Sequence, residues 1–478
     1  MIFLWILLGL LLCFLLVVFI RALLFKPLQE PIPEQVPIEV NVPLVTAHFQ
    51  DMLRLKTISN LDDSLVDLAE FQKFQALLPT LYPTVYAKCE YEQIGKHGIL
   101  LHLHGQGKDA PTVLMAHYDV VPVVAEAWDE PAFEGLIKDG ELWGRGTLDT
   151  KGTLLSILES AELLLKQGFV PQSDVYFAFG GDEECMGSDA VAIVDTLFER
   201  GIHPALVLDE GGAIVEGVFP GVKESAALIG IAEKGNVFVD VAAKGKGGHA
   251  SAPPAKQSVG VLAKALSSLE SHAMPFTLTA PALKMFDLMG RNSTFGYRLI
   301  FANLWCFAPL LNLICKKSGG ELNALVRTTC ALTRLSASDA YNVLPTQSKA
   351  GCNLRIICGE SIDNVKAQME KIIDDDSVKV TVLGGSQPSS ISPTSGAGWE
   401  RVVSAIRQTY PGVLVSPYLM LAGSDSRHYC KLCNNVYRFS GMPMSKEQRG
   451  MIHNHNERIR VNMISKTVQF FAHVLEQC

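Results

Sequence analysis

The sequence predicts an α/β protein: a mostly parallel sheet flanked by helices, with an α+β unit inserted and an apolar helix in front. Strand-like apolar runs alternate with helical periods, which predicts the sheet. The pattern changes near residue 233, and 478 residues exceed one ordinary domain. We therefore expect five segments: an apolar leader 1–25, a stalk 26–44, a main domain in two parts, 45–232 and 385–478, and an inserted unit 233–384.

Composition excludes some classes of protein. The net charge is -8 and no dense Lys/Arg tract occurs, which argues against a nucleic-acid-binding protein. The cysteines number eleven, an odd count that does not suggest a disulfide framework. The only CxxC spacing joins Cys430 to Cys433, and we interpret that pair as structural because no second pair completes a zinc site.

The leader predicts a single-pass membrane anchor. Residues 2–20 are uncharged and almost wholly apolar, and a helix of that length rises about 28 Å, close to the bilayer core. A cleaved signal, the alternative, would have a basic start and a small-residue cleavage site. Orientation stays open: Arg21 and Lys26 favour a cytoplasmic body, whereas the sequon at Asn292 points the other way. The five prolines of residues 26–43 predict an extended stalk.

Several elements of the body are predicted from periodicity. His102 and His104 lie two apart on a predicted strand and face one side; we interpret them as a half-exposed strand face rather than a ligand pair. The expected strands are 97–105, 111–117, 174–180, 205–209, 236–251 and two runs within 328–357. The expected helices are 45–55, 64–78, 153–167, 189–200, 258–269, 362–373 and 461–476.

Acidic and imidazole side chains gather where the predicted strands end. His117, Glu183, Glu184 and Asp209 each follow an apolar strand. In open α/β sheets functional residues collect at the carboxyl ends of strands. Packing alone does not explain this repetition, so the sequence predicts a site at that edge.

The residue types point to a metal centre. In His117-Tyr118-Asp119 the two polar side chains point the same way, which suits His117 as a ligand and Asp119 as the carboxylate that orients it. Asp149 follows a glycine-rich turn and offers two oxygens that can bridge two cations. Of the adjacent Glu183 and Glu184, one can ligate a metal while the other acts as general base.

Two further ligands are expected downstream. One is Asp209 or Glu210, and the other is His453 or His455. The mixed nitrogen and oxygen ligands suit Zn²⁺, Co²⁺ or Mn²⁺.

Nine motifs together resemble a known family. The sequence resembles the dinuclear-zinc metallopeptidases that include carboxypeptidase S, aminoacylase and glutamate carboxypeptidase, and within them the branch of carboxypeptidase S and N-fatty-acyl-amino-acid hydrolase. The motifs are HYDVVPV from His117, WGRGTLDTKG from Trp143, GGDEECMGSDA from Gly180, VLDEGG from Val207, GGHASAPP from Gly247, YNVLP from Tyr341, NLRI from Asn353, GSDSRHY from Gly423 and IHNHNE from Ile452.

The resemblance implies a role for each site residue. Two zinc ions would be bound by His117 and Asp209, by Glu184 and His453, and by Asp149 between them. Glu183 would be the general base. Asp209 is preferred to Glu210 as the acid at the strand end, and His453 to His455 by its place in the family's H-G-x-N-E pattern, although Asn454 replaces the glycine. The peptide Asp149-Thr150 would be cis.

The inserted unit would be a lid that often dimerises. His249 would stabilise the oxyanion of the tetrahedral intermediate, in some relatives from the partner subunit. Asn342 and Arg355 would bind substrate, with Arg355 suited to a free carboxylate. Ser424, Asp425 and Arg427 would line the same cleft. The stretch 276–320 is long and apolar for such a lid; it would contact a membrane or an apolar substrate, or form extra lid core or a dimer surface.

The expected activity is hydrolysis of an amide or peptide bond beside a free-carboxylate residue. Water held between two metals would be deprotonated by Glu183 and attack the carbonyl. Two alternatives stay open: an N-acyl amino acid substrate in place of a peptide, and a non-catalytic binding protein on a hydrolase scaffold.

Overall fold

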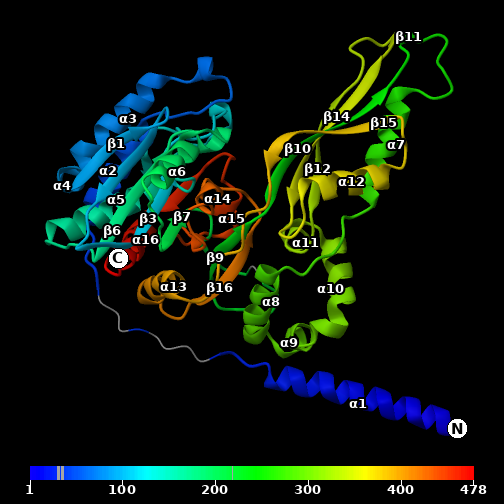
Figure 1. Cartoon of the computed structure of the whole chain (residues 1–478), viewed down its shortest axis with the longest axis horizontal. Helices are drawn as coiled ribbons and strands as arrows, with labels where there is room; N and C mark the ends of the chain where they lie inside the picture. The colour runs from blue at the N-terminus through cyan, green and yellow to red at the C-terminus, as the bar shows by residue number, and fades with distance from the viewer. Residues whose placement is uncertain (29–32, 34–36, 218) are drawn as a thin grey trace.

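The computed structural model describes residues 1–28, 33, 37–217 and 219–478 (Figure 1). Of the predicted stalk 26–44, residues 29–32 and 34–36 lie outside the described residues, and its last three residues belong to a helix. The body begins with a helix at Val42.

The main domain is built on a nine-stranded sheet in the order β1-β2-β6-β3-β7-β17-β9-β16, with β8 paired to β9. Its centre is parallel, through β6, β3, β7 and β17, and β1 and β2 are antiparallel at one edge. This confirms the predicted fold class. The strands are β1 (Cys89–Ile94), β2 (Gly98–Leu103), β3 (Gly107–His117), β6 (Ser173–Gly180), β7 (Leu206–Asp209), β8 (Ile214–Val215), β9 (Ala226–Glu233), β16 (Leu414–Met420) and β17 (Val436–Arg438).

Helices cover both faces because successive residues of the central strands point to opposite sides. Leu114 and Ala116 of β3 belong to the core cluster with α2, α3, α5, α13 and α16, whereas Val113 and Met115 pack with α6 and α14. The helices of the domain are α2 (Val42–Arg54), α3 (Leu68–Leu81), α4 (Pro83–Lys88), α5 (Lys151–Lys166), α6 (Asp189–Glu199), α13 (Ala397–Thr409), α14 (Ser426–Tyr429), α15 (Lys446–Arg449) and α16 (Val461–Leu475).

Short strands and 3₁₀ turns complete the main domain. β18 (Arg458–Arg460) pairs with β5 (Glu141–Trp143), and β5 pairs with β4 (Leu136–Lys138). Three-residue 3₁₀ turns occur at η1 (Asp63–Leu65), η2 (Ala125–Ala127) and η3 (Glu183–Cys185). The β18–β5 pair brings a C-terminal segment against the turn that precedes Asp149.

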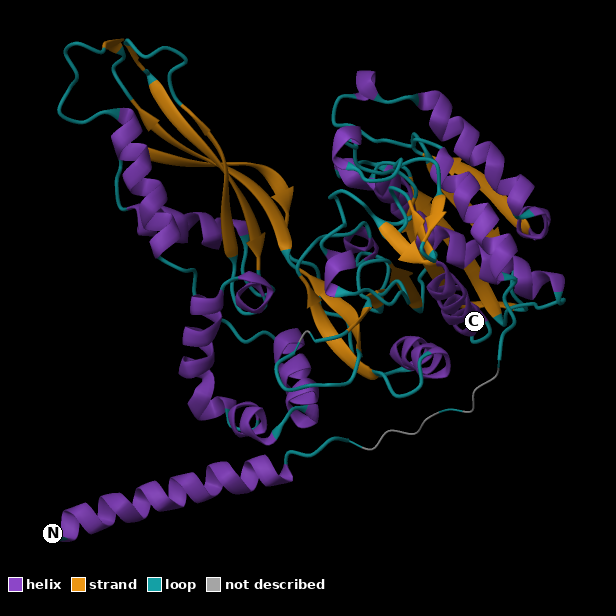
Figure 2. Cartoon of the chain, turned by 180° about the vertical axis from the view of Figure 1, so that it is seen from behind, coloured by secondary structure: helices purple, strands orange, loops and turns teal. Residues whose placement is uncertain are grey.

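The inserted unit is a separate four-stranded antiparallel sheet, β12-β14-β10-β15, that projects away from the main domain (Figure 2). Two helices pack on it with a core of their own, which includes Val239, Leu262 and Met369. Its elements are β10 (Gly235–Lys244), β11 (Gly248–His249), α7 (Ser258–Ser271), β12 (Thr329–Ser336), β13 (Val343–Leu344), β14 (Gln347–Ile356), α12 (Ile362–Ile373) and β15 (Val378–Ser386).

The apolar stretch within the insertion folds as helices that pack on the main domain. Met285, Phe286 and Met289 of α8 belong to the large core cluster of the main domain rather than to the core of the lid sheet. Phe286 and Phe301 pack together beside Phe219. The helices are α8 (Ala280–Asn292), α9 (Phe295–Phe301), α10 (Leu304–Ser318) and α11 (Gly320–Ala324). The chain thus returns to the main domain before it completes the lid.

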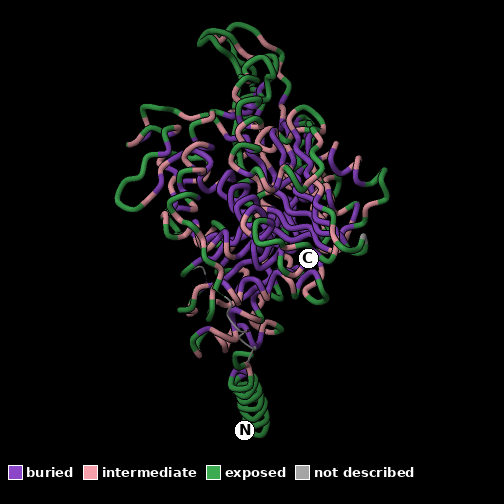
Figure 3. Tube along the Cα trace, turned by 90° about the vertical axis from the view of Figure 1, so that its left-hand side faces the viewer, coloured by how far each residue is buried: buried purple, intermediate pink, exposed green. Residues whose placement is uncertain are grey.

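The leader forms α1 (Ile2–Leu24), a 23-residue helix. Among the described residues it is the one continuous helix long and apolar enough to cross a membrane, with a mean hydropathy of 3.2; an N-terminal signal sequence has the same property. Most of it is exposed (Figure 3). Its C-terminal half contacts α9.

Candidate metal centre

His117 ends β3 with its ring fixed by Asp119. Its Nδ1 lies 3.0 Å from the backbone oxygen of Asp119 and 3.2 Å from the carboxylate. Both residues are buried. Because Nδ1 is held in this way, Nε2 is left as the atom able to bind a metal. The contact suits the predicted roles, His117 as a ligand and Asp119 as the carboxylate that orients it, and those roles stay a prediction.

Asp119 also fixes the turn that carries the two glutamates. Its carboxylate accepts hydrogen bonds from the backbone N–H groups of Glu183 and Glu184, at 3.2 and 3.1 Å, and from the hydroxyl of Ser59 at 2.7 Å. One buried carboxylate thus orients His117 and caps η3.

Asp149 lies in a loop that is shaped by Glu457. Glu457 is fully buried, and its carboxylate accepts from Arg145 Nη1 at 2.8 Å and from the backbone N–H groups of Gly146, Leu148 and Asp149. Gly146 adopts φ +92°, a conformation that disfavours a side chain. The peptide Asp149-Thr150 is cis, as the resemblance implied.

The two oxygens of Asp149 face two different groups of side chains. Oδ1 lies 3.1 Å from His117 Nε2, and that nitrogen lies 3.7 Å from Glu210 Oε1. Oδ2 lies 3.0 Å from His453 Nε2, which lies 2.9 Å from Glu184 Oε2. Ligand atoms of His117, Asp149 and Glu184 all lie within 4.8 Å of one another. The arrangement is that of two adjacent cation sites sharing one aspartate.

The geometry separates the two pairs of alternatives. Glu210 faces His117, whereas Asp209 accepts a hydrogen bond from the backbone N–H of Ser426 at 3.0 Å. The geometry therefore favours Glu210, the alternative, over Asp209 as the third acidic ligand, beside Asp149 and Glu184. It favours His453 over His455, because His453 contacts both Asp149 and Glu184.

Charge in the cluster is poorly balanced by protein groups alone. Burial, and then repulsion from Asp149, raises the pKa of Glu210 well above its usual range. Burial also raises the pKa of Glu184, and its Oε1 is buried without a hydrogen-bond partner. Hydrogen bonds to Asp149 and Glu184 raise the pKa of His453 to about 10. Divalent cations would neutralise this excess of carboxylates, so the donor set fits a dinuclear metal centre.

The pKa values of His117 and Asp149 are also shifted by the groups around them. Burial disfavours the charged imidazole, but hydrogen bonds with Asp119 and Asp149 raise its pKa well above the usual range. Burial works against ionisation of Asp149, yet hydrogen bonds with His117 and His453 lower its pKa. A metal ion would displace the protons that these pairs share.

Glu183 stands beside the ligands and pairs with no cation within hydrogen-bond distance among the described residues. Burial, with repulsion from Asp425 and Glu184, raises its pKa well above the usual range. A small cavity joins Glu183 to His117, Glu210 and Asp425. A carboxylate in this position can take a proton from water in the cavity, which is the role predicted for it.

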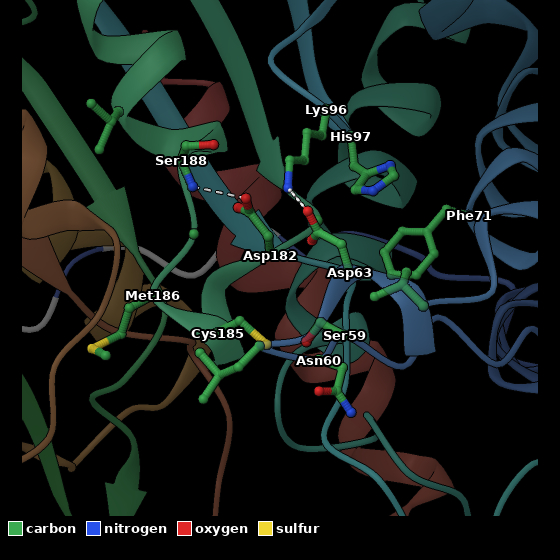
Figure 4. Close-up of a pocket in the computed structure, with 15 residues that line it drawn as sticks. Ser59, Asn60, Asp63, Phe71, Lys96, His97, Asp182, Cys185, Met186 and Ser188 are labelled. Atoms are coloured by element: carbon green, nitrogen blue, oxygen red, sulfur yellow. Dashed lines mark hydrogen bonds and ion pairs between the residues drawn. The ribbon is translucent and has the colours of Figure 1, made fainter.

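A larger pocket lies beside the same turn (Figure 4). Its wall includes Asp182, Cys185 and Met186 from the turn and Lys96 from the loop before β2, with Lys96 Nζ 2.6 Å from Asp63. Asn236, in the first lid strand, donates to the sulfur of Met186 at 3.8 Å. The base of the lid therefore touches the catalytic turn.

Three of the predicted substrate-binding residues lie on two elements: Arg355 is in the lid strand β14, and Ser424 and Arg427 are in or just before α14. Burial lowers the pKa of Arg355, and the negative charges of Glu183 and Glu233 oppose that effect. Arg427 donates to the backbone oxygen of Ser424 at 2.7 Å. Ser424 is fully buried, and its hydroxyl lies 3.2 Å from Glu233 and 2.7 Å from Ser426. These bonds give Ser424 a supporting place in the loop.

His249 belongs to β11, which lies at the far tip of the lid, away from the main domain (Figure 1). β11 pairs with β13 (Val343–Leu344), and the backbone N–H of Ala250 donates to the backbone oxygen of Asn342, which directly precedes β13, so Asn342 lies beside this pair. The side chains of His249 and Asn342 are exposed. The structure therefore does not bring these two predicted residues to the site within one chain.

Two buried groups that support the site were not predicted. Glu457 holds the Asp149 loop, and Glu233 accepts from Arg438 at 2.7 Å and from the backbone N–H of Ser424. Glu457 ends the quoted motif IHNHNE, so its place beside a ligand was a usable signal. No local pattern in the sequence pointed to Glu233, because its partner Arg438 lies 205 residues away.

The sequence matches the family model "Peptidase family M20/M25/M40" over residues 113–477. The chain belongs to this family. Its members are metal-dependent peptidases and related hydrolases, and the chain is a hydrolytic enzyme with a candidate set of metal ligands in place.

Similar proteins agree with this assignment. The chain is 35% identical to probable carboxypeptidase S-like 2 of Dictyostelium discoideum, covering 85% of this chain and 79% of the relative. It is 35% identical to the N-fatty-acyl-amino acid synthase/hydrolase PM20D1 of Xenopus tropicalis, covering 89% and 84%. The fold resembles the M20 family metallo-carboxypeptidase Sso-CP2 of Sulfolobus solfataricus, with a TM-score of 0.67, 15% identity, and 92% and 99% of the chains covered.

Proposed function

We propose that this member of the M20 family uses two zinc ions to hydrolyse the amide bond of a peptide or acyl group joined to an amino acid with a free carboxylate. The observation that carries the proposal is that the two carboxylate oxygens of Asp149 face two different sets of side chains. One oxygen lies on the side of His117 and Glu210, and the other lies on the side of His453 and Glu184. Two imidazoles with several carboxylates are a donor set suited to zinc, cobalt or manganese.

The protein residues then have distinct tasks. The two cations, when bound by these ligands, supply Lewis acidity that polarises the scissile carbonyl and makes water a better acid. Glu183 takes the proton from the attacking water and delivers it to the leaving amine. Asp119 keeps both His117 and the Glu183 turn in position. Glu457 keeps the Asp149 loop in position.

Arg355 supplies the recognition of the free carboxylate. Arg355 pairs with Asn236 at the base of the lid sheet, the charges of Glu183 and Glu233 act on its guanidinium, and its forked donors match a carboxylate. Arg427, 3.9 Å from Asp425, is the second cation at this side of the cluster. A substrate whose carboxylate is blocked as an amide would lose this interaction.

A second copy of the chain would supply His249 and Asn342. Both lie exposed at the lid tip, beyond reach of their own metal cluster. The lid also has a free edge: β12 carries exposed Leu332 and Leu335 at the end of its sheet. Pairing of two lids along this edge would bury those side chains and carry each tip toward the partner subunit.

The leader would remain as a single-pass anchor. Its backbone and side chains bond to the folded body: Arg21 donates to Ala302 O at 3.0 Å, and Asn303 donates to Val18 O at 3.0 Å. A cleaved signal would leave Asn303, which is fully buried, without this acceptor. The mass of the mature N-terminus and resistance of the protein to extraction by alkaline carbonate test the anchor.

N-acyl amino acids are the second candidate substrate class. The relative from Xenopus tropicalis is named for N-fatty-acyl-amino acids, and α10, which contacts the leader through Trp305, exposes four large apolar side chains. The proposed mechanism is the same for both classes, because only the group on the acyl side differs.

The test is a substrate panel on the full-length protein, purified in detergent with added Zn²⁺ and read by mass spectrometry. The panel contains dipeptides, N-acetyl and N-oleoyl amino acids, and the same compounds with the carboxylate blocked as an amide. We expect Glu183→Gln to lose about 10²–10⁴-fold in kcat while it keeps its zinc. Glu199→Gln, at the exposed end of α6, is the matched control. Wild-type turnover by Glu183→Gln, or equal cleavage of blocked compounds, would contradict the proposal.

A further inference from the structure

Helices α9 and α10 form an elbow, residues 295–318, that packs against the leader. The chain bends by 107° between the two helices, which together are apolar enough for a broken membrane span or a re-entrant loop. Phe19 stacks edge-on against Phe295 at 5.5 Å, and Phe14 against Trp305 at 5.8 Å. The elbow therefore contacts the C-terminal half of α1 rather than only its end.

The outer face of α10 is apolar and uncovered. Trp305 is 60% exposed and Leu313 is 63% exposed, and Leu310 and Ile314 are also exposed. Residues three and four apart lie on one helical face, so Leu310, Leu313 and Ile314 form an apolar stripe, and Trp305 adds apolar surface at the start of the same helix. The stripe ends at Lys316 and Lys317 in the last turn. Contiguous apolar surface with a basic end is typical of a helix at a membrane.

The contact with α1 fixes the depth of the elbow. Phe14 precedes Leu24 by ten residues, so it lies about 15 Å along the helix from that end. This is about half the thickness of a bilayer core. When α1 spans the bilayer, Trp305 beside Phe14 lies within the hydrocarbon.

Two polar side chains at the elbow donate hydrogen bonds within the protein. Asn303, at the corner, donates to Val18 O and Leu299 O. Arg298 donates to Ser293 O at 3.1 Å. Inside a bilayer polar groups must be satisfied internally, and these bonds do so for the amide group of Asn303 and the Nε–H of Arg298.

We propose that the α9–α10 elbow is embedded in the leaflet next to the body, and that it holds the enzyme against the lipid surface. This inference rests on the proposed anchor. It also narrows the substrate class: amino acids carrying an apolar acyl chain partition into the same leaflet, so the enzyme would meet them at the membrane rather than in solution.

Tryptophan fluorescence in nanodiscs tests the elbow. The full-length protein is reconstituted with phospholipids brominated on their acyl chains, which quench nearby indoles. The chain has five tryptophans, and the quenched fraction is compared between wild type and Trp305→Phe. We expect the variant to lose a quenched component. Trp399→Phe, which removes a buried indole of the main domain, is the matched control and should lose none.

Trp5→Phe separates this inference from the anchor. Trp5 lies in α1, so quenching that depends on Trp5 reports the anchor alone. Quenching of Trp5 without quenching of Trp305 would overturn the elbow and leave the anchor and the hydrolase activity untouched. Quenching of neither would overturn both membrane assignments. Protection of Trp305 by a second protein copy would also leave it unquenched and would overturn the inference.

A separate cluster at the edge of the main sheet has the composition of a metal site. Glu90 of β1 lies directly opposite His102 of β2. His104 Nε2 lies 2.9 Å from Glu90 Oε1, and His102 Nδ1 lies 3.7 Å from Glu90 Oε2. Ligand atoms of the three side chains all lie within 4.8 Å of one another.

The second ring nitrogen of His102 contacts a carboxylate, as is usual for histidines that bind metals. Its Nε2 lies 2.9 Å from Asp174 Oδ2, and the other oxygen of Asp174 accepts from the backbone N–H of Gly105. Its ring stacks on Tyr176 at 4.3 Å. A carboxylate on one ring nitrogen fixes the tautomer and leaves Nδ1 aimed at Glu90 and His104.

The geometry points to a further Zn²⁺ site formed by Glu90, His102 and His104, with Asp174 as the carboxylate behind His102. It is distinct from the catalytic centre. Tyr176 pairs with His102, whereas Gly180, four residues further along β6, pairs with His117. Four strand residues span about 13 Å. Two imidazoles and a carboxylate, with water completing the sphere, suit zinc.

Counting bound zinc tests this site. Full-length protein is dialysed against buffered free Zn²⁺ and analysed by mass spectrometry for metal per chain. We expect His104→Ala and Glu90→Gln each to bind about one zinc fewer than wild type, with unchanged hydrolysis because neither contacts the catalytic ligands. His203→Ala, another exposed histidine, is the control. Equal zinc content in wild type and both variants would overturn the site.

Discussion

Replacing Glu457 with alanine should cost more stability than any exposed charge removal in this domain. Glu457 is fully buried, and its carboxylate accepts from the Arg145 guanidinium and from three backbone N–H groups. Removing it leaves Arg145 as a buried, uncompensated charge, which costs about 3–5 kcal/mol. That is a large share of the roughly 5–15 kcal/mol by which a domain is stable.

Urea unfolding of the full-length protein in detergent measures this loss, with Glu447→Ala as the control. Glu447 pairs with Arg458 at 2.8 Å, but its side chain is 72% exposed, so its removal should cost no more than about 1 kcal/mol. Zinc affinity should fall about 10–100-fold in Glu457→Ala because the loop holding Asp149 loses its support. A loss of stability no larger than that of Glu447→Ala would refute the reasoning.

The remaining predictions concern the ligands, the metal and a buried lysine. Glu210→Ala should bind about one zinc fewer per chain, whereas Asp209→Asn should keep both ions with about 10–100-fold weaker affinity; the reverse in metal analysis would restore Asp209 as the ligand. Removal of zinc by a chelator should abolish hydrolysis and lower the melting temperature, since roughly 100-fold excess of a ligand over its Kd stabilises by about 2.7 kcal/mol; a melting temperature unchanged by the chelator would contradict a metal bound in the folded state. Burial lowers the pKa of Lys234 from 10.5 to about 7. The unfolded chain therefore holds more protons between these values, stability should rise from about pH 7 to about pH 10, and Lys234→Met should reduce that rise in urea titrations at successive pH values.

The sequence predicted the fold class and most of the cluster because both follow from local patterns. His117, Glu183 and Glu184 each follow a buried strand, and the parallel centre of the sheet brings those ends to one edge. The choice between Asp209 and Glu210 could not be made in the same way. Neighbouring residues at a strand end point to opposite sides, so the answer depends on the exact place where the strand stops, and pattern alone does not give it.

Contacts between residues far apart in the sequence could not be predicted from local patterns. Arg438 and Glu233 form a buried pair across 205 residues, and neither residue carries a local signal of burial. The apolar stretch 276–320 was predicted to be buried or bound, but periodicity does not say by what. The structure divides it: α8 enters the core of the main domain, and the outer face of α10 stays uncovered.

The segment 453–457 would couple metal binding to folding. His453 reaches Asp149 from a backbone with φ +59°, uncommon for a residue with a side chain. Four residues later, Glu457 holds the Asp149 loop, and Arg145 donates to Asn454 O at 2.7 Å between them. A ligand and the support of its neighbouring ligand thus arrive on one short segment. Because an unfolded chain holds no such site, the free energy of metal binding becomes free energy of docking this segment. The zinc ions would therefore close the domain as well as serve its chemistry.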